Sequence, residues 1–145
     1  MSETHYNPKI PFKTSLYMRQ FRKFVIKGKP FSDARRFFIN FQREGESGMD
    51  TIAFHFDARL NYLGDYKTIV CNHKRERMWG HEERFKIFPF SEQKEFEITI
   101  IVYEDMYQVE VDGMEVVRFY HRIPIATVDS FMIDGHTDIS LVKMM

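Results

Sequence analysis

The segment HFDAR, residues 55–59, places an imidazole, a carboxylate and a guanidinium two residues apart. In an extended strand, successive side chains point to opposite faces, so His55, Asp57 and Arg59 share one face. The opposite face carries the apolar side chains Ile52, Phe54, Phe56 and Ala58. We therefore predict a strand that buries one face and presents hydrogen-bonding groups on the other.

More polar and aromatic groups follow at spacings that suit neighbouring strands. The segment 67–72 alternates and places Asn72 on one face with Thr68 and Val70. Trp79 is the only tryptophan, and it precedes Glu82 and Arg84, which share a strand face. Trp79 is out of phase with that pair, so we expect a bulge at Gly80 to correct the phase. The sequence thus predicts that three adjacent strands bring seven residues to one region: His55, Asp57, Arg59, Asn72, Trp79, Glu82 and Arg84.

This set of side chains suits a carbohydrate ligand. Each sugar hydroxyl both donates and accepts hydrogen bonds, so the planar side chains of Arg, Asn, Asp and Glu match it well. The hydrogens on one face of galactose form an apolar patch, because the axial 4-hydroxyl lies on the other side. An exposed indole can cover that patch and exclude water from it. A neutral, polar ligand also explains a site whose charges nearly balance.

The elements that must position these residues are strands. The segments RFFINFQ (36–42), FEITIIVY (96–103) and YQVEVDG (107–113) all alternate, and Asp112-Gly113 is a hairpin turn signal. Turn-like clusters at 43–48, 63–65 and 134–136 separate the strands. Many short strands without intervening helices indicate an antiparallel sandwich or barrel. The best helical candidate, SDARRF at 32–37, is short, and a single turn is expected near 125–130.

Length, composition and charge define the broad class. A chain of 145 residues with 43% hydrophobic and 29% charged residues is typical of one soluble globular domain. Its 21 basic and 21 acidic residues cancel, which argues against a nucleic-acid partner. No segment resembles a secretory signal or reaches membrane-spanning length. The single cysteine, Cys71, excludes an intrachain disulfide, and we expect it to face the core and stay reduced.

The order of these motifs resembles that of the galectins, the β-galactoside-binding lectins. The matching pattern is H-F-x-x-R at 55–59, V-x-N at 70–72 and W-G-x-E-x-R at 79–84, followed by F-P-F at 88–90. The resemblance covers roughly residues 21–143 and includes FVIKGKP near the start and FYHRIP at 119–124. It implies a jelly-roll β-sandwich and metal-free sugar binding.

The resemblance also implies a role for each matching residue. His55 and Arg59 would hold the axial 4-hydroxyl of galactose, and Arg59 would also reach toward the ring oxygen. Asn72 and Glu82 would take the 6-hydroxyl, and Trp79 would stack beneath the ring. The second sugar of a disaccharide would contact Arg59, Glu82 and Arg84.

One position departs from the family pattern. Galectins carry Asn where this chain has Asp57, and usually Pro where it has Ala58. An ionised carboxylate only accepts hydrogen bonds, whereas an amide also donates. Asp57 could also draw Arg59 or Arg84 into an ion pair that competes with the sugar. We therefore predict that Asp57 weakens or redirects galactoside affinity.

Two enzymatic or metal-binding alternatives are less favoured by the same residues. His55 and Asp57 could ligate a metal, but Arg59 on the same face would repel a cation. Asp57 and Glu82 could form the carboxylate pair of a glycoside hydrolase. Two nearby arginines would keep both carboxylates ionised, whereas one must be protonated to act as the general acid.

The sequence therefore predicts a β-sandwich in which residues 1–13 form an N-terminal arm and 14–145 a galectin-type carbohydrate-recognition domain. The expected function is non-enzymatic binding of β-galactoside glycans on glycoproteins or glycolipids, without a cofactor or a metal. The alternative is a galectin-fold protein interaction module with little or no sugar binding. The resemblance further implies a cytoplasmic protein that can also leave the cell without a leader peptide, and that can form homodimers. We expect no nucleic-acid partner and no membrane insertion.

Overall fold

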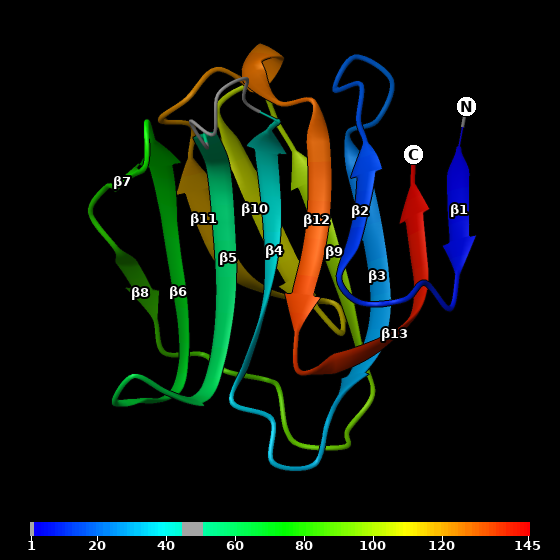
Figure 1. The fold of residues 1–145 in the computed structure, drawn as a ribbon, viewed down its shortest axis with the longest axis vertical. Coiled ribbons are helices and arrows are strands. Elements are labelled where there is room, and N and C mark those ends of the chain that lie inside the picture. Colours follow the sequence, from blue (N-terminus) through cyan, green and yellow to red (C-terminus); the bar gives the residue numbers. More distant parts are fainter. Residues whose placement is uncertain (1, 45–50) are drawn as a thin grey trace.

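The computed structural model describes residues 2–44 and 51–145 and forms two antiparallel sheets packed face to face (Figure 1). The six-stranded sheet has the order β1 (Glu3–Tyr6), β13 (Thr137–Met144), β3 (Lys23–Pro30), β9 (Phe96–Val102), β10 (Met106–Val111) and β11 (Met114–Tyr120). The other sheet has the order β2 (Phe12–Ser15), β12 (Ser130–Gly135), β4 (Arg36–Arg43), β5 (Thr51–Tyr62), β6 (Asp65–Arg75) and β7 (Met78–Trp79), and β8 (Glu83–Phe85) also pairs with β6. This arrangement confirms the predicted β-sandwich.

Two of the predicted turns are tight hairpins. Tyr62 pairs with Asp65 across the turn between β5 and β6, and both central residues, Leu63 and Gly64, have positive φ angles of 50° and 81°. Asp112 and Gly113 connect β10 to β11 with φ angles of 50° and 84°. Positive φ at both central positions matches the twist of antiparallel strands. Residues 45–48 of the predicted turn at 43–48 lie outside the described residues.

The N-terminal segment is more regular than the sequence indicated. Residues 1–13 were expected to form an N-terminal arm, and in the structure β1 pairs with β13 and β2 pairs with β12. These two four-residue strands extend one edge of each sheet, and they are too short to show an alternating pattern. The boundary expected at residue 13 therefore falls within β2.

The helical expectations had mixed outcomes. The segment 32–37 forms no helix, because Arg36 already begins β4 and Asp33 has a positive φ angle of 61°. The turn expected near 125–130 is confirmed as a 3₁₀ helix, Ile125–Thr127, directly after Pro124. None of the helices in the described part of the chain is long and apolar enough to span a membrane.

The core between the sheets is rich in phenylalanine. Phe54 of β5 and Tyr107 of β10 stack with ring centroids 4.5 Å apart, which joins the two sheets directly. Phe54, Phe56 and Cys71 are fully buried, so the predicted inward face of β5 and the core position of the cysteine are confirmed. This packed layer fixes β5 and β6, and their opposite face carries the predicted polar residues.

Candidate functional site

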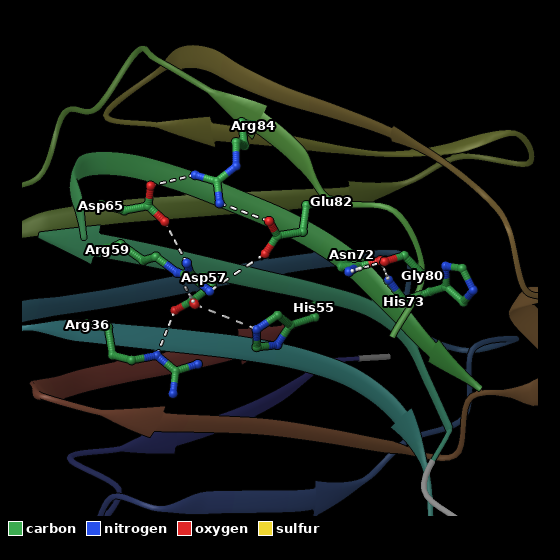
Figure 2. A network of polar contacts seen from close by, with 10 residues as sticks. All are labelled: Arg36, His55, Asp57, Arg59, Asp65, Asn72, His73, Gly80, Glu82 and Arg84. Atoms are coloured by element: carbon green, nitrogen blue, oxygen red, sulfur yellow. Dashed lines mark hydrogen bonds and ion pairs between the residues drawn. The ribbon is translucent and has the colours of Figure 1, made fainter. Parts of the chain in front are cut away.

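His55, Asp57 and Arg59 of β5 and Asn72 of β6 lie on the outer face of the sheet, as the alternation predicted (Figure 2). Trp79 ends β7, Glu82 directly precedes β8 and Arg84 lies in β8. His55 pairs directly with Asn72, and Val70 pairs with both Asp57 and Arg84. Cross-strand partners in an antiparallel pair lie about 5 Å apart, so this register brings the side chains of three strands together. The sequence had predicted this juxtaposition.

The segment around Gly80 is an interruption of the strand rather than the predicted bulge. Pairing with β6 stops after Trp79 and resumes at Glu83, which lets Trp79 and Arg84 reach the same face despite their spacing. A Cβ atom at position 80 would lie 2.1 Å from Cε1 of His73, so any other residue here would require that ring to move. The Gly80 N–H donates to the carbonyl of His73 at 3.0 Å and anchors the interruption.

Trp79 forms an accessible aromatic surface beside the polar groups. It is 49% exposed, and its ring centroid lies 4.9 Å from that of His55. The Lys74 ammonium lies 5.1 Å from the indole centroid. An indole that is half exposed next to a polar floor can receive the apolar face of a flat ligand.

Asp57 is fully buried, which the sequence did not predict. One carboxylate oxygen accepts a hydrogen bond from Nε of Arg36 at 3.0 Å, and the other accepts one from Nε of Arg59 at 2.9 Å. Nε2 of His55 lies 3.8 Å from Oδ2 of Asp57, the oxygen that accepts from Arg59. Burial would raise the pKa of Asp57, but its hydrogen bonds and the nearby positive groups outweigh that effect and hold the pKa below its usual value.

Asp57 therefore forms the expected ion pair with Arg59, but none with Arg84. Arg84 instead donates to Asp65 at 2.6 Å and to Glu82 at 2.8 Å. Arg59 donates to the second oxygen of Asp65 at 2.6 Å, and its other terminal nitrogen lies 3.9 Å from Glu82. These four side chains form a closed ring of alternating charges, visible in Figure 2.

The hydrogen bonds of this ring lower the pKa of Asp65. The largest contribution comes from the guanidinium of Arg84, and Arg59 adds to it. With Arg36 and Asp57 included, the cluster contains three guanidinium groups and three carboxylates, so its formal charge is zero. The arrangement fixes the arginine side chains in place without leaving a net charge.

The imidazole of His55 and the amide of Asn72 are also held by neighbouring groups. Nδ1 of His55 lies 2.6 Å from the side-chain oxygen of Asn40 and donates to it. Asn72 donates from Nδ2 to the Gly80 carbonyl at 2.9 Å. Both side chains are less than a tenth exposed. The polar face is therefore preorganised, since its groups need little reordering to receive a ligand.

Three residues of this network were not predicted from the sequence. Arg36 lay in the segment considered for a helix, and Asp65 lay in a cluster interpreted only as a turn. Arg122, which contacts Asn72, belongs to a motif quoted for the resemblance but given no role. Asp65 could have been found from the sequence, because it directly follows a two-residue hairpin turn that brings the chain back beside the strand carrying Arg59.

The described residues, 2–44 and 51–145, contain no group of three or more His, Cys, Asp or Glu side chains arranged to hold a metal ion. Burial raises the pKa of the Cys71 thiol well above its usual value, since the side chain lies in the core. The chemistry that this face offers is hydrogen bonding and aromatic stacking.

Comparison with known proteins decides the family. Residues 10–144 match the family model described as galactoside-binding lectin. The chain belongs to the galectin family. It is 32% identical to galectin-6 of Mus musculus over 140 residues, which cover 95% of this chain and 45% of that protein. It is 35% identical to galectin-3 of Mus musculus over 99 residues, which cover 68% of this chain and 35% of that protein.

Two solved structures have the same fold as this galectin chain. The Caenorhabditis elegans galectin LEC-6 superposes with a TM-score of 0.84 at 22% identity, covering 98% of this chain and 95% of that chain. Sheep galectin-11, in a complex with glycerol, superposes with a TM-score of 0.81 at 24% identity, covering 92% and 96%. The galectin chain spans less than half the length of the curated relatives it matches. These findings confirm the family that the motif order indicated.

Proposed function

We propose that this galectin domain is a non-enzymatic lectin that binds β-galactoside-containing glycans on the polar face of β5, β6 and β8. The main support for this proposal is the half-exposed indole of Trp79, which lies beside His55 and a charge-balanced ring of arginines and carboxylates. The indole matches the apolar face of galactose, and the polar groups match its hydroxyls.

In this proposal each residue keeps the role that the family resemblance implies. His55 and Arg59 hold the 4-hydroxyl, while Asn72 and Glu82 take the 6-hydroxyl. Glu82 and Arg84, with Arg59, contact the second sugar. The ion pairs of Arg59 with Asp65 and of Arg84 with Glu82 support these roles. They fix the directions of the guanidinium donors before the ligand arrives, which lowers the entropic cost of binding.

The proposed ligand is uncharged. Three arginines face three carboxylates within hydrogen-bonding or ion-pair distance, so the site gives no net attraction to an ion. Glycans of glycoproteins or glycolipids that end in galactose have the required chemistry. A single recognition face of this kind holds one terminal disaccharide.

Asp57 acts on affinity through Arg59 in this proposal. Each of its oxygens accepts from an arginine Nε and the side chain is fully buried, so the carboxylate is poorly placed to accept a sugar hydroxyl. Its negative charge draws the Arg59 guanidinium toward β5 and competes with the ligand for that cation. We expect affinity to be weakened by this competition rather than abolished.

The pairing of the carboxylates with arginines argues against glycoside hydrolysis. A general acid needs a raised pKa, whereas the pKa of Asp57 is lowered and Glu82 is paired with Arg84. We therefore propose binding without turnover of the glycan.

A glycan array that compares the natural chain with Trp79→Ala tests the proposal. Met78→Ala is the matched control, because Met78 is the adjacent residue of β7 and is 74% exposed. We expect galactoside-dependent signal for the natural chain and for Met78→Ala, and loss of that signal for Trp79→Ala. An array with no signal for any of the three would favour the protein interaction module.

A further inference from the structure

The amide of Asn72 has almost no free hydrogen-bonding capacity. Its side-chain oxygen accepts from the backbone N–H of His73 at 2.8 Å and from the guanidinium of Arg122 at 3.2 Å. Its nitrogen donates one hydrogen to the Gly80 carbonyl at 2.9 Å, a contact shown in Figure 2. An amide oxygen has two lone pairs and an amide nitrogen has two hydrogens. One N–H is therefore the only group that Asn72 can offer to a ligand.

Arg122 reaches this amide from the segment that follows β11, a strand of the opposite sheet. Its terminal nitrogens donate to the His81 carbonyl at 2.8 Å and to the Glu83 carboxylate at 2.6 Å. Its guanidinium carbon lies 4.7 Å from the ring centroid of Phe119, and only 24% of the side chain is exposed. Arg122 thus fastens the segment between β7 and β8 through His81 and Glu83.

His73 completes the arrangement around Arg122. Its Nδ1 lies 3.0 Å from Nη1 of Arg122, the nitrogen that also contacts Asn72 and the His81 carbonyl, so these three acceptors share two hydrogens. An arginine can only donate, so a hydrogen bond between the two side chains makes Nδ1 of His73 the acceptor. Burial is the main cause that lowers the pKa of His73, and the charge of Arg122 lowers it further. The ring of His73 in turn packs against Gly80, whose carbonyl accepts the hydrogen bond from Asn72.

These contacts determine which way the amide points. If the Asn72 amide were rotated by half a turn, its NH₂ group would face two donors, the His73 N–H and the Arg122 guanidinium. Such donor–donor contacts are unfavourable in a buried site. Arg122 therefore contributes to selecting the orientation in which Asn72 presents a donor.

We propose that Arg122 is a positioning residue that orients the Asn72 amide to present a single N–H donor to the 6-hydroxyl of galactose. This inference rests on the proposed function. With Asn72 donating and Glu82 accepting, the site selects a free primary hydroxyl that accepts one hydrogen bond and donates another. A sugar without that hydroxyl makes no hydrogen bond to Asn72 or Glu82 at this position and gains nothing from Arg122.

The test measures the affinity for lactose and for a lactose analogue that lacks the galactose 6-hydroxyl. The variants are Arg122→Met and Arg122→Lys, and Arg118→Met is the matched control. Arg118 lies on the neighbouring strand β11 and pairs with Glu115 on the surface, away from Asn72. Thermal unfolding of each variant verifies that it is folded.

We expect Arg122→Met to weaken lactose binding by up to roughly tenfold, the upper end of what one neutral hydrogen bond contributes, and binding of the analogue by less than about twofold. Arg122→Lys keeps the charge but lacks the planar fork, so an intermediate loss is expected. Arg118→Met should bind both sugars as the natural chain does.

Equal losses for the two sugars, or unchanged lactose binding by Arg122→Met, would overturn the positioning role. If Arg122→Met fails to fold, the ratio of the two losses in Arg122→Lys decides in the same way. A natural chain that binds neither sugar would instead overturn the proposed function itself, so the two failures are distinguishable.

Discussion

The substitution Asp57→Asn changes the charge of the buried carboxylate with almost no change in shape. In the structure, the two carboxylate oxygens each accept from a different arginine, Arg36 at 3.0 Å and Arg59 at 2.9 Å. An amide has only one acceptor oxygen, so one arginine Nε would face an NH₂ group. The substitution therefore removes one charge-assisted hydrogen bond and weakens the other.

The expected cost follows from these two bonds. A hydrogen bond to a charged group contributes about 1.5–3 kcal/mol, and a neutral one about 0.5–1.5 kcal/mol. The side chains of Arg36 and Arg59 are 23% and 12% exposed, so water relieves part of the loss. We expect the free energy of unfolding to fall by about 2 kcal/mol, which corresponds to a decrease of roughly 4–8 °C in Tm for a domain of this size.

Chemical denaturation monitored by tryptophan fluorescence and circular dichroism measures this change. Asp138→Asn is the control, because Asp138 is exposed on β13, in the other sheet. The double variant Arg36→Met/Asp57→Asn should lose less stability than the sum of the single variants, since the two side chains share one bond. Stability of Asp57→Asn within about 0.5 kcal/mol of the natural chain would refute this account of the buried carboxylate.

The same variant tests the effect of Asp57 on affinity. Without the negative charge, the Arg59 guanidinium is no longer drawn toward β5 and is freer to donate to a sugar. We expect lactose binding to tighten by roughly threefold, the equivalent of part of one hydrogen bond. An unchanged dissociation constant would show that the departure from asparagine has no consequence for the ligand.

Two further predictions concern acid stability and Gly80. The pKa values of Asp57 and Asp65 are lowered in the folded state, so their contribution to the free energy of unfolding is complete above the ordinary carboxyl pKa. This contribution is lost as the pH falls below about 4 toward the folded pKa values. Urea unfolding between pH 7 and pH 2 should show the decrease in stability, and the stability of Asp57→Asn should depend less steeply on pH. Gly80→Ala should cost about 1–3 kcal/mol, because its Cβ would overlap His73, which Arg122 holds in place; equal stability of Gly80→Ala and the natural chain would contradict this packing.

The fold and the faces of the central strands could be predicted because alternation is a local signal. Phe54 and Phe56 point inward and His55 points outward for reasons contained within one strand. The edge strands β1 and β2 were missed, since four residues are too few to establish a period and their pairing depends on distant strands.

The burial of Asp57 depends on contacts that no local pattern records. Arg36 comes from β4 and is brought over the carboxylate by the register in which Arg36 pairs with Arg59. Arg122 comes from the segment after β11, a strand of the opposite sheet, and lies 50 residues from Asn72 in the sequence. Side chains that position a site from another element are therefore visible only in the folded chain.

We propose that the polar face formed by β5, β6 and the segment 79–84 recognises a galactoside through hydrogen bonds and one indole. Calorimetric titration of the natural chain with lactose, with sucrose as the control disaccharide, tests it most directly. We expect saturable binding of one lactose per chain and no measurable binding of sucrose. Absence of saturable heat with lactose, or equal binding of the two sugars, would contradict it.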